Sequence, residues 1–402
     1  ALSQGSDGFW TGTIDVSAYS PEIAGGQHFV GVEVFDELGG KWVSYQDYAS
    51  PDDNADIQWV FEIGDMIQST ATIHNGSVYV GSEDGNLYCI DFDTGSQSWS
   101  MNTGARVISK PAVYTDTSGD STVIWGSENC KVYAADAVTG ELLWTYTTGG
   151  GILSDPLVSD EMAFVGSGDG KIYCLDAQTG NIVWSYQTDG LMRQRPVISG
   201  GVLYAFVRDT YIWYAINIQD GSLKWWGNAG TDESLFVCGD VRPVIAGGKL
   251  WCIDAQNTRP GYLNMDTGSL EWTGSIPNVS SRGMATDGEY VFYCSNSGRL
   301  ISAIDAETDE IVWQKDLRAS DSDSDLQQMQ IDSGLIYQDG VLYHVAERGR
   351  ITGLDPETGS ILFCFDAAGY PERVFWSTPE ASGSSIICSG IDGNVYCVSV
   401  SG

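Results

Sequence analysis

The chain has 402 residues, and its 54 acidic against 19 basic side chains give a formal net charge of -35. So acidic a chain lacks the clustered Lys and Arg that neutralise phosphates, which excludes nucleic acid as a partner and argues against an anionic membrane surface. Hydrophobic residues make up 42% of the sequence, with 14 Trp and 20 Tyr, so we expect a large core and exclude disorder. No apolar run approaches the roughly 18 residues of a membrane-spanning helix, so direct membrane insertion is not expected.

The N-terminal segment predicts short strands in an incomplete pattern. Phe9-Trp10 has the character of a strand that carries an aromatic residue, with no strands before it. Residues 21–23 and 29–33 predict the first two strands of a unit whose last strand is residues 56–59.

From Ser77 onward, one pattern recurs along the chain. The stretch from Ser77 to Trp99 reads SVYVGSEDGNLYCIDFDTGSQSW, and it returns as TVIWGSENCKVYAADAVTGELLW, ending at Trp144, and as MAFVGSGDGKIYCLDAQTGNIVW, ending at Trp184. Each copy has an apolar strand, a tight turn, an alternating strand, a Thr-Gly turn and a strand that carries the aromatic residue. A short strand near Pro precedes each copy, so a unit has four strands, A to D, with the aromatic residue on strand D.

The repeat predicts an all-β fold, a β-propeller formed by residues 1–402 as a single domain. The last unit has strands B and C at residues 385–388 and 394–400 but no strand D, so we expect the N-terminal strand at Trp10 to complete it and close the ring. Nine blades are predicted, with eight as the alternative because residues 21–61 match the repeat least well. The aromatic positions are Trp10, Trp59, Trp99, Trp144, Trp184, Trp225, Trp272, Trp313 and Phe363.

The pattern Asp-x-x-Thr-Gly-x-x-x-Trp, as in Asp136 to Trp144 and Asp176 to Trp184, resembles the tryptophan-docking repeat of the quinoprotein (PQQ-like) propellers. The resemblance covers essentially the whole chain. It implies that each Trp lies flat against the Gly-containing turn of a neighbouring blade, so we interpret these residues as structural rather than as platforms for a ligand.

The resemblance leaves function open, because the family includes quinone-dependent alcohol and sugar dehydrogenases, outer-membrane assembly lipoproteins and sensor ectodomains. The dehydrogenases carry two adjacent cysteines that form a ring disulfide against the quinone, and this sequence has no Cys-Cys pair. Their calcium cluster and catalytic Asp match no motif here either. We therefore favour a non-enzymatic protein, with a PQQ-dependent oxidoreductase as an alternative.

Sorting the basic residues onto the repeat gives a candidate ligand site. All twelve arginines fall in or beside D-to-A or B-to-C connections, which share one face of a propeller, opposite the acidic Asp-x-x-Thr-Gly turns. This pattern predicts an anion site at the mouth of the central channel, since Arg binds carboxylate or phosphate in a fork. Pairing of each Arg with Asp of a neighbouring blade is the alternative. The candidate ligand-binding residues are Arg106, Lys110, Arg193, Arg195, Arg242, Arg282, Arg373 and Trp376.

Two acidic loops and one cysteine pair complete the candidates. The loops concentrate carboxylates at a spacing that suits Ca²⁺, although solvated loops are the alternative, and no cofactor is assigned with certainty. Cys388 and Cys397 flank the Asp392-Gly393 turn and are expected to face each other, as a disulfide or as two packed thiols. The candidate calcium ligands are Asp321, Asp323, Asp325, Asp52, Asp53 and Asp56.

The sequence thus predicts a secreted, periplasmic or cell-surface scaffold that binds a protein or a small anionic ligand through its Arg-bearing face. The first residue is Ala1, as in an exported chain after removal of a signal peptide, although a truncated chain would look the same. The acidity also suits a salt-rich or extracellular setting. A structural subunit of a surface assembly, formed by self-association, is a further alternative.

Overall fold

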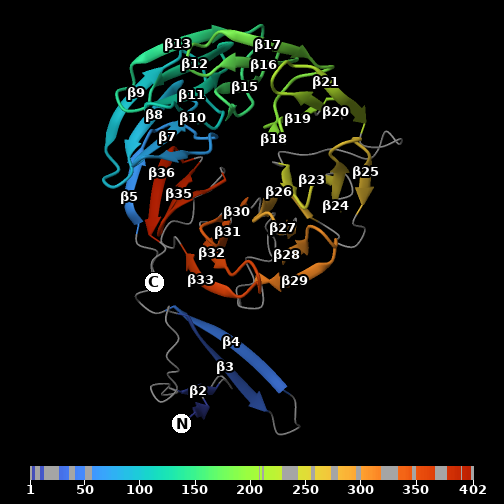
Figure 1. The fold of residues 1–402 in the computed structure, drawn as a ribbon. Helices are drawn as coiled ribbons and strands as arrows, with labels where there is room; N and C mark the ends of the chain where they lie inside the picture. The colour runs from blue at the N-terminus through green and yellow to red at the C-terminus, as the bar shows by residue number, and fades with distance from the viewer. Residues whose placement is uncertain are drawn as a thin grey trace.

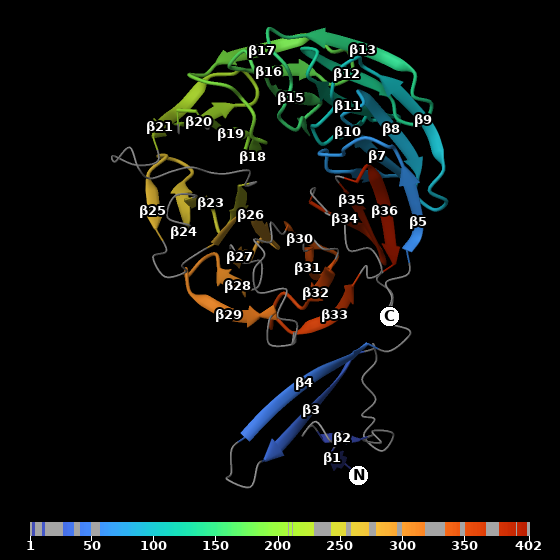
Figure 2. The same ribbon diagram turned by 180° about the vertical axis from the view of Figure 1, so that it is seen from behind.

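Four-stranded antiparallel sheets, arranged as blades around a ring, account for most of the chain after residue 56 (Figure 1). Figure 2 shows the same ring from behind. No helix long and apolar enough to cross a membrane occurs among the residues that the structure describes. This computed structural model describes residues 2–4, 10–12, 27–35, 41–49, 57–207, 209–210, 212–228, 243–254, 259–272, 279–295, 300–317, 334–345, 350–366, 378–390 and 392–399.

Blades 1 to 4 follow one another along the chain, and each runs from an inner strand A to an outer strand D (Figure 1). Their strands are β6 (Thr72–His74), β7 (Ser77–Gly81), β8 (Asn86–Asp91) and β9 (Gln97–Asn102); β10 (Ala112–Thr115), β11 (Ser121–Ser127), β12 (Lys131–Asp136) and β13 (Leu142–Thr147); β14 (Leu157–Ser159), β15 (Met162–Gly166), β16 (Lys171–Asp176) and β17 (Ile182–Gln187); and β18 (Val197–Ser199), β19 (Val202–Val207), β20 (Ile212–Asn217) and β21 (Leu223–Asn228).

Blades 5 to 7 repeat this order, and blade 8 takes its outer strand from the N-terminal part of the chain. Their strands are β22 (Val244–Ala246), β23 (Lys249–Asp254), β24 (Arg259–Asn264) and β25 (Leu270–Trp272); β26 (Val279–Thr286), β27 (Tyr290–Ser295), β28 (Leu300–Asp305) and β29 (Ile311–Asp316); β30 (Gly334–Gln338), β31 (Val341–Val345), β32 (Arg350–Leu354) and β33 (Ile361–Asp366); and β34 (Glu380–Ser382), β35 (Ser385–Ser389), β36 (Asn394–Ser399) and β5 (Ile57–Glu62).

The ring therefore has eight blades in the part of the chain that the structure describes, and the prediction of nine was wrong. The strand that closes the ring is β5 and not the one at Trp10: on β5, Trp59 lies opposite Cys397 and Glu62 opposite Asn394. Trp10 lies in β2 (Trp10–Gly12), which pairs only with β1 (Leu2–Gln4).

The segment predicted to supply a ninth blade forms a hairpin instead. Its strands β3 (Gln27–Phe35) and β4 (Lys41–Ala49) pair with each other along nine residues and join no blade (Figure 1). The predicted strand at residues 21–23 lies outside the described residues. The prediction failed because β36 has an open outer edge, and β5 fills that edge rather than completing a sheet with the strands before it.

The hydrophobic core is divided into layers between neighbouring blades. One layer combines Ile124 and Val132 of blade 2 with Val165 and Tyr173 of blade 3, and all four are buried. Strands B and C of a blade contribute apolar side chains to the layers on both sides of that blade, because successive side chains point to opposite faces of a sheet. Each blade thus depends on both of its neighbours.

Tryptophans on strand D connect neighbouring blades. Trp144 lies against Gly180 of blade 3, where a Cβ atom would come within 2.5 Å of the indole ring, and its Nε1 donates to Ala177 O at 3.1 Å. Gly180 has φ +70°, a backbone conformation that glycine adopts without strain. Trp272 and Trp10 have side chains outside the described part of the chain. The same indole-to-carbonyl bond is made by Trp59, Trp99, Trp184, Trp225 and Trp313, at 2.8 to 3.1 Å.

Blade 6 departs from the Thr-Gly turn in a way that brings charge to its contact with blade 5. Asp309 stands at the glycine position with φ +64°, and its carboxylate accepts a hydrogen bond from Lys249 Nζ on blade 5. Tyr262 OH lies 3.0 Å from Asp309 Oδ2 and 2.9 Å from Glu271 Oε2. The ammonium group of Lys249 also lies 4.5 Å from the centroid of the Tyr262 ring, so an ion pair and a cation–π contact connect these two blades.

Phe363 stands at the docking position that precedes the closing blade, and the topology explains why it is not Trp. Strands C and D of blade 8 come from distant parts of the chain, so the short C-to-D turn whose carbonyl accepts the indole N–H in the other blades does not connect them. A Cβ atom at Gly353 of its own blade would lie 2.3 Å from the Phe363 ring, which also packs against the core layer that blade 7 shares with blade 8.

We therefore expect Phe363→Trp to lower the free energy of unfolding by about 1 kcal/mol, because the indole N–H loses a partner that every described docking Trp has. Urea denaturation of both forms measures the difference. A gain in stability would show that an acceptor is present.

Candidate functional site

The two faces of the ring are defined by which connections hydrogen-bond to each other. D-to-A loops run between the B-to-C turns of the two flanking blades: Val107 N donates to Ser82 O, and Glu128 N donates to Arg106 O, both at 3.0 Å. We call this side the loop face. On the opposite side, A-to-B turns bond to C-to-D turns, as between Ala177 N and Glu161 O, and we call this side the turn face.

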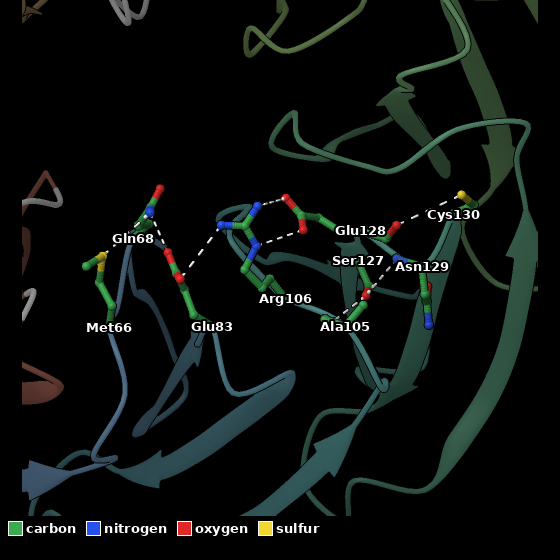
Figure 3. A network of polar contacts seen from close by, with 9 residues as sticks. All are labelled: Met66, Gln68, Glu83, Ala105, Arg106, Ser127, Glu128, Asn129 and Cys130. Carbon is green, nitrogen blue, oxygen red and sulfur yellow. Dashed lines mark hydrogen bonds and ion pairs between the residues drawn. The ribbon is translucent and has the colours of Figure 1, made fainter.

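On the loop face, Arg106 links blades 1 and 2 (Figure 3). Its guanidinium holds Glu128 in a two-pronged contact, Nε to Oε2 at 2.8 Å and Nη2 to Oε1 at 2.7 Å, and its Nη1 lies 3.7 Å from Glu83 Oε2. Gln68 Nε2 donates to the other oxygen of Glu83 and so extends this series of polar contacts toward blade 8. The hydrogen bonds to Glu128 raise the pKa of Arg106 above its usual value. This arginine therefore pairs with acids of the flanking blades; the alternative interpretation expected aspartates, and both acids here are glutamates.

Lys110 is the second predicted ligand residue that the structure shows in an ion pair. Its Nζ lies 2.7 Å from Glu380 Oε2, and both side chains are largely buried. Glu380 belongs to β34, the inner strand of blade 8, and Lys110 lies in the connection that leads into β10, the inner strand of blade 2, so the contact passes blade 1 along the central channel. The backbone N–H of Lys110 donates to Asp155 Oδ1 of the next blade at 2.7 Å. Through Lys110, Glu380 of blade 8 and Asp155 of blade 3 are thus connected to blade 2.

The other candidates divide into two described arginines and four residues whose side chains lie outside the described part of the chain. Arg193 is exposed and makes no ion pair with any described residue. Arg195 is half-buried and stands directly before Pro, as Lys110 and Asp155 do in their blades. Of the remaining candidates, Arg282 lies in β26 with its side chain outside the described part of the chain, and Arg242, Arg373 and Trp376 lie wholly outside it.

The loop face is not basic where the structure describes it. The repeat predicted arginines on this face and acidic residues on the opposite face. In the described ion pairs of this face, however, each cation is held by an acid of the same face. The described D-to-A and B-to-C connections of blades 8, 1, 2, 3 and 4 carry the cations Arg106, Lys110, Arg193 and Arg195 and the acids Asp65, Glu83, Asp84, Glu128, Asp155, Asp169, Asp189, Asp209 and Asp392.

Carboxylate–tyrosine contacts brace the same turns, and the sequence analysis missed them. Tyr173 OH donates to Asp169 Oδ2 at 2.6 Å, and Tyr88 OH donates to Asp84 Oδ2 at 2.5 Å. In blade 2 an amide replaces the acid, and Asn129 Nδ2 lies 2.6 Å from the Tyr OH. The signal was present in the repeat as Asp-Gly followed by Tyr, four residues after the acid. Burial and the bond to Asp84 raise the pKa of Tyr88 to about 12.

These contacts predict a defined pH dependence of stability. Burial opposes ionisation of Asp169, but hydrogen bonds from Tyr173 OH and the amides of Gly149 and Lys171 outweigh it, so its pKa lies below the ordinary value. A lowered folded pKa adds stability above the unfolded pKa of about 3.9, and this stability is lost as the pH falls through the folded pKa.

We expect Asp169→Asn, the residue type that blade 2 has at this position, to be less stable than the wild type at neutral pH. The difference should shrink as the pH falls from about 6 to about 2. Urea midpoints across this range measure it, and a difference that stays constant would contradict the assignment.

The structure corrects the expectation for the cysteine pair and leaves the acidic loops undescribed. On β35 and β36, Cys388 lies opposite Tyr396, and Cys397 opposite Ile387. This one-residue offset directs the two thiols to opposite faces of the sheet, and both are free and buried. No group of three or more metal-ligating side chains occurs among the described residues. The candidate calcium ligands Asp52, Asp53, Asp56, Asp321, Asp323 and Asp325 lie outside them.

Comparison with known proteins gives a family and a fold. The family model described as outer membrane protein assembly factor BamB matches residues 31–118, 115–314, 162–360 and 296–401. No curated protein matches the sequence.

Among solved structures, BamB from Moraxella catarrhalis is 18% identical, with a TM-score of 0.62 over 85% of this chain and 98% of that one. The computationally designed Ika8 protein is 16% identical, with a TM-score of 0.65 over 84% and 97%. At these identities the structures show a shared fold.

Proposed function

This chain belongs to the family described by the outer membrane protein assembly factor BamB, and we propose that it is a non-enzymatic scaffold that binds a protein partner through its loop face, outside the cytoplasm. The family assignment supports a role in protein binding, because the family is named for an assembly factor. It does not identify the partner, so the choice of face depends on the residues of this chain.

Arg193 carries the choice of the loop face. It is exposed, and it makes no ion pair within the described part of the chain, whereas Arg106 and Lys110 on the same face already hold glutamates. Met66, at 37% exposure, also lies on this face. Arg and Met are enriched in protein interfaces, and an unpaired guanidinium selects a partner that presents a carboxylate.

The loops that present these residues are held in place before any partner binds. In the loop that contains Arg193, Met192 N donates to Ser167 O at 3.2 Å, and Thr188 N donates to Gly170 O at 2.8 Å. Because the B-to-C turn of blade 3 holds the backbone of this loop, binding costs little conformational entropy there. This favours recognition by a rigid surface over enclosure of a small molecule by a moving loop.

A PQQ-dependent oxidoreductase gains no specific support from the described residues. PQQ carries three carboxylates and would need several available cations, and two of the predicted ones are bound to glutamates. Adding PQQ with Ca²⁺ and measuring a bound chromophore and dye reduction with alcohols or sugars tests this alternative directly.

The proposed function is tested by photocrosslinking in the cells that produce the protein. A photoreactive amino acid replaces Leu191, two residues before Arg193 on the loop face, so that Arg193 itself is kept; the control replaces Gln178 in an exposed C-to-D turn of the same blade on the turn face. We expect a discrete protein adduct from position 191 and none from position 178. Adducts of equal yield from both positions, or none from position 191, would contradict the choice of face.

A further inference from the structure

The outer strands of blades 2 and 3 expose a pair of apolar residues each, and this rim of the ring is not used by the proposed function. Leu142 and Leu143 on β13 are 48% and 50% exposed, and Ile182 and Val183 on β17 are 47% and 48% exposed. We call these four residues the rim patch. The strands that carry them lie side by side at the outer edge of the ring (Figures 1 and 2). Adjacent exposed apolar residues of this kind mark interaction sites.

The same positions are polar in blade 1, so the fold does not require apolar residues there. Gln97 and Ser98 on β9 stand where Leu142 and Leu143 stand on β13, two residues and one residue before the docking Trp. Both are exposed. The rim patch is therefore a property of particular blades and not a consequence of Trp docking.

A β-bulge determines how the rim patch can be used. The register between β12 and β13 shifts at Ala134 and Ala135, so Leu143 has no partner on β12, and the same shift occurs in blade 3. A bulge at an edge strand hinders the continuation of the sheet by a foreign strand. The rim patch is therefore suited to contact by side-chain packing.

Charge varies along these outer strands in one direction. The acids Asp136 and Glu141 precede the apolar pair of blade 2 at the turn face. At the other end of the strand, Lys131 lies opposite Thr147, and in blade 3 Lys171 lies opposite Gln187. Neither lysine makes an ion pair with a described residue. In both blades the apolar pair thus opens the strand, beside a turn that contains Asp136 or Asp176, and the far end of the strand lies beside a lysine; blade 2 adds Glu141 to its turn, where blade 3 has Asn181.

From this arrangement we propose that the rim patch binds the rim patch of a second copy of the chain, in an antiparallel, two-fold arrangement. Turning one copy end for end places its lysines against the acidic turns of the other while the apolar pairs meet. Blade 6 also exposes an apolar pair, Ile311 and Val312, but its strand C begins with Leu300 in place of the lysine. It lacks the charge pattern and is the natural control.

The net charge of -35 sets the conditions under which this association forms. Two such copies repel each other over a Debye length of about 10 Å in 0.1 M salt, which falls to about 3 Å in 1 M salt. We therefore expect a monomer at low salt and a dimer at high salt, where the apolar contact is no longer opposed. This is the reverse of an association held by ion pairs alone.

The test is sedimentation of the full chain between about 1 and about 200 µM, in about 0.1 M and about 1 M NaCl. The variant replaces Leu142 and Ile182 by Gln, and Leu143 and Val183 by Ser, the pair that blade 1 already has. We expect dimerisation of the wild type at high salt and at least a tenfold loss of affinity in the variant. The blade 6 control, Ile311→Gln with Val312→Ser, is expected to dimerise like the wild type.

Three outcomes would overturn the proposal: a wild-type monomer throughout, equal losses in the variant and the blade 6 control, or a dimer that high salt dissociates. Far-UV circular dichroism and the urea midpoint show whether the variants fold, so that loss of structure is not taken for loss of contact.

A charge exchange tests the orientation separately at about 0.3 M NaCl. Lys131→Glu should weaken dimerisation more than Lys224→Glu, which changes the net charge equally at a residue on β21. Mixing the Lys131→Glu copy with a Glu141→Lys copy should restore it. Equal effects of the two lysine variants, or no recovery on mixing, would contradict the antiparallel arrangement.

Discussion

Replacing Trp184 by Ala is expected to lower the free energy of unfolding by about 3–5 kcal/mol. The indole is 9% exposed, lies against Gly221 of blade 4, and donates from Nε1 to Ile218 O at 2.8 Å. The substitution removes a large buried side chain from between two blades and leaves the Ile218 carbonyl without this partner. Both losses weaken the same contact, so they are expected to act together.

Urea denaturation followed by circular dichroism measures this effect, and the chain offers a matched control. Trp226 is also a tryptophan on an outer strand, but it is 60% exposed, and Trp226→Ala should change the free energy of unfolding by less than about 0.5 kcal/mol. Similar losses for the two variants would show that docking between blades is not the reason why Trp184 contributes to the free energy of unfolding.

Removal of β5 is expected to have the second large effect. A chain of residues 57–402 retains every strand of the ring, whereas residues 63–402 lack the outer strand of blade 8. Loss of β5 uncovers Cys397, which is buried, and the edge of β36, and it removes Trp59 from its contact with blade 1. An uncovered apolar strand edge promotes association between chains.

We therefore expect residues 57–402 to unfold at the same temperature as the full chain, and residues 63–402 to unfold at a much lower temperature or to aggregate. Thermal unfolding and size-exclusion chromatography compare the three chains. If residues 63–402 were as stable as residues 57–402, β5 would not close the ring.

The blade architecture could be predicted from the sequence because its signals are local. Each unit carries its own turns and docking Trp within about 45 residues, so the four strands and their order follow from the repeat. The number of blades could not be obtained in this way. The pattern around Trp59 is the same whether its strand completes a sheet with β3 and β4 or with β36, and only the pairing across the ring decides.

The candidate site depended still more on contacts that are distant in sequence. The repeat placed Arg106 and Lys110 on one face, but their partners Glu83, Glu128 and Glu380 lie on other blades, up to 270 residues away. The repeat allows arginines to pair with acids of neighbouring blades, but it does not identify the particular acids. The cysteine pair failed for a geometric reason, because an offset of one residue across a hairpin moves a side chain to the other face.

Closure of the ring between β5 and β36 determines the number of blades and the face that each connection occupies, and a disulfide tests it most directly. Glu62 and Asn394 lie opposite each other, so Glu62→Cys with Asn394→Cys should give a 62–394 disulfide on oxidation, identified by mass spectrometry of linked peptides. In a nine-bladed ring closed by the Trp10 strand, the corresponding position is Thr13. We expect the 62–394 bond to form and Thr13→Cys with Asn394→Cys to give none; a 13–394 bond without a 62–394 bond would contradict eight blades.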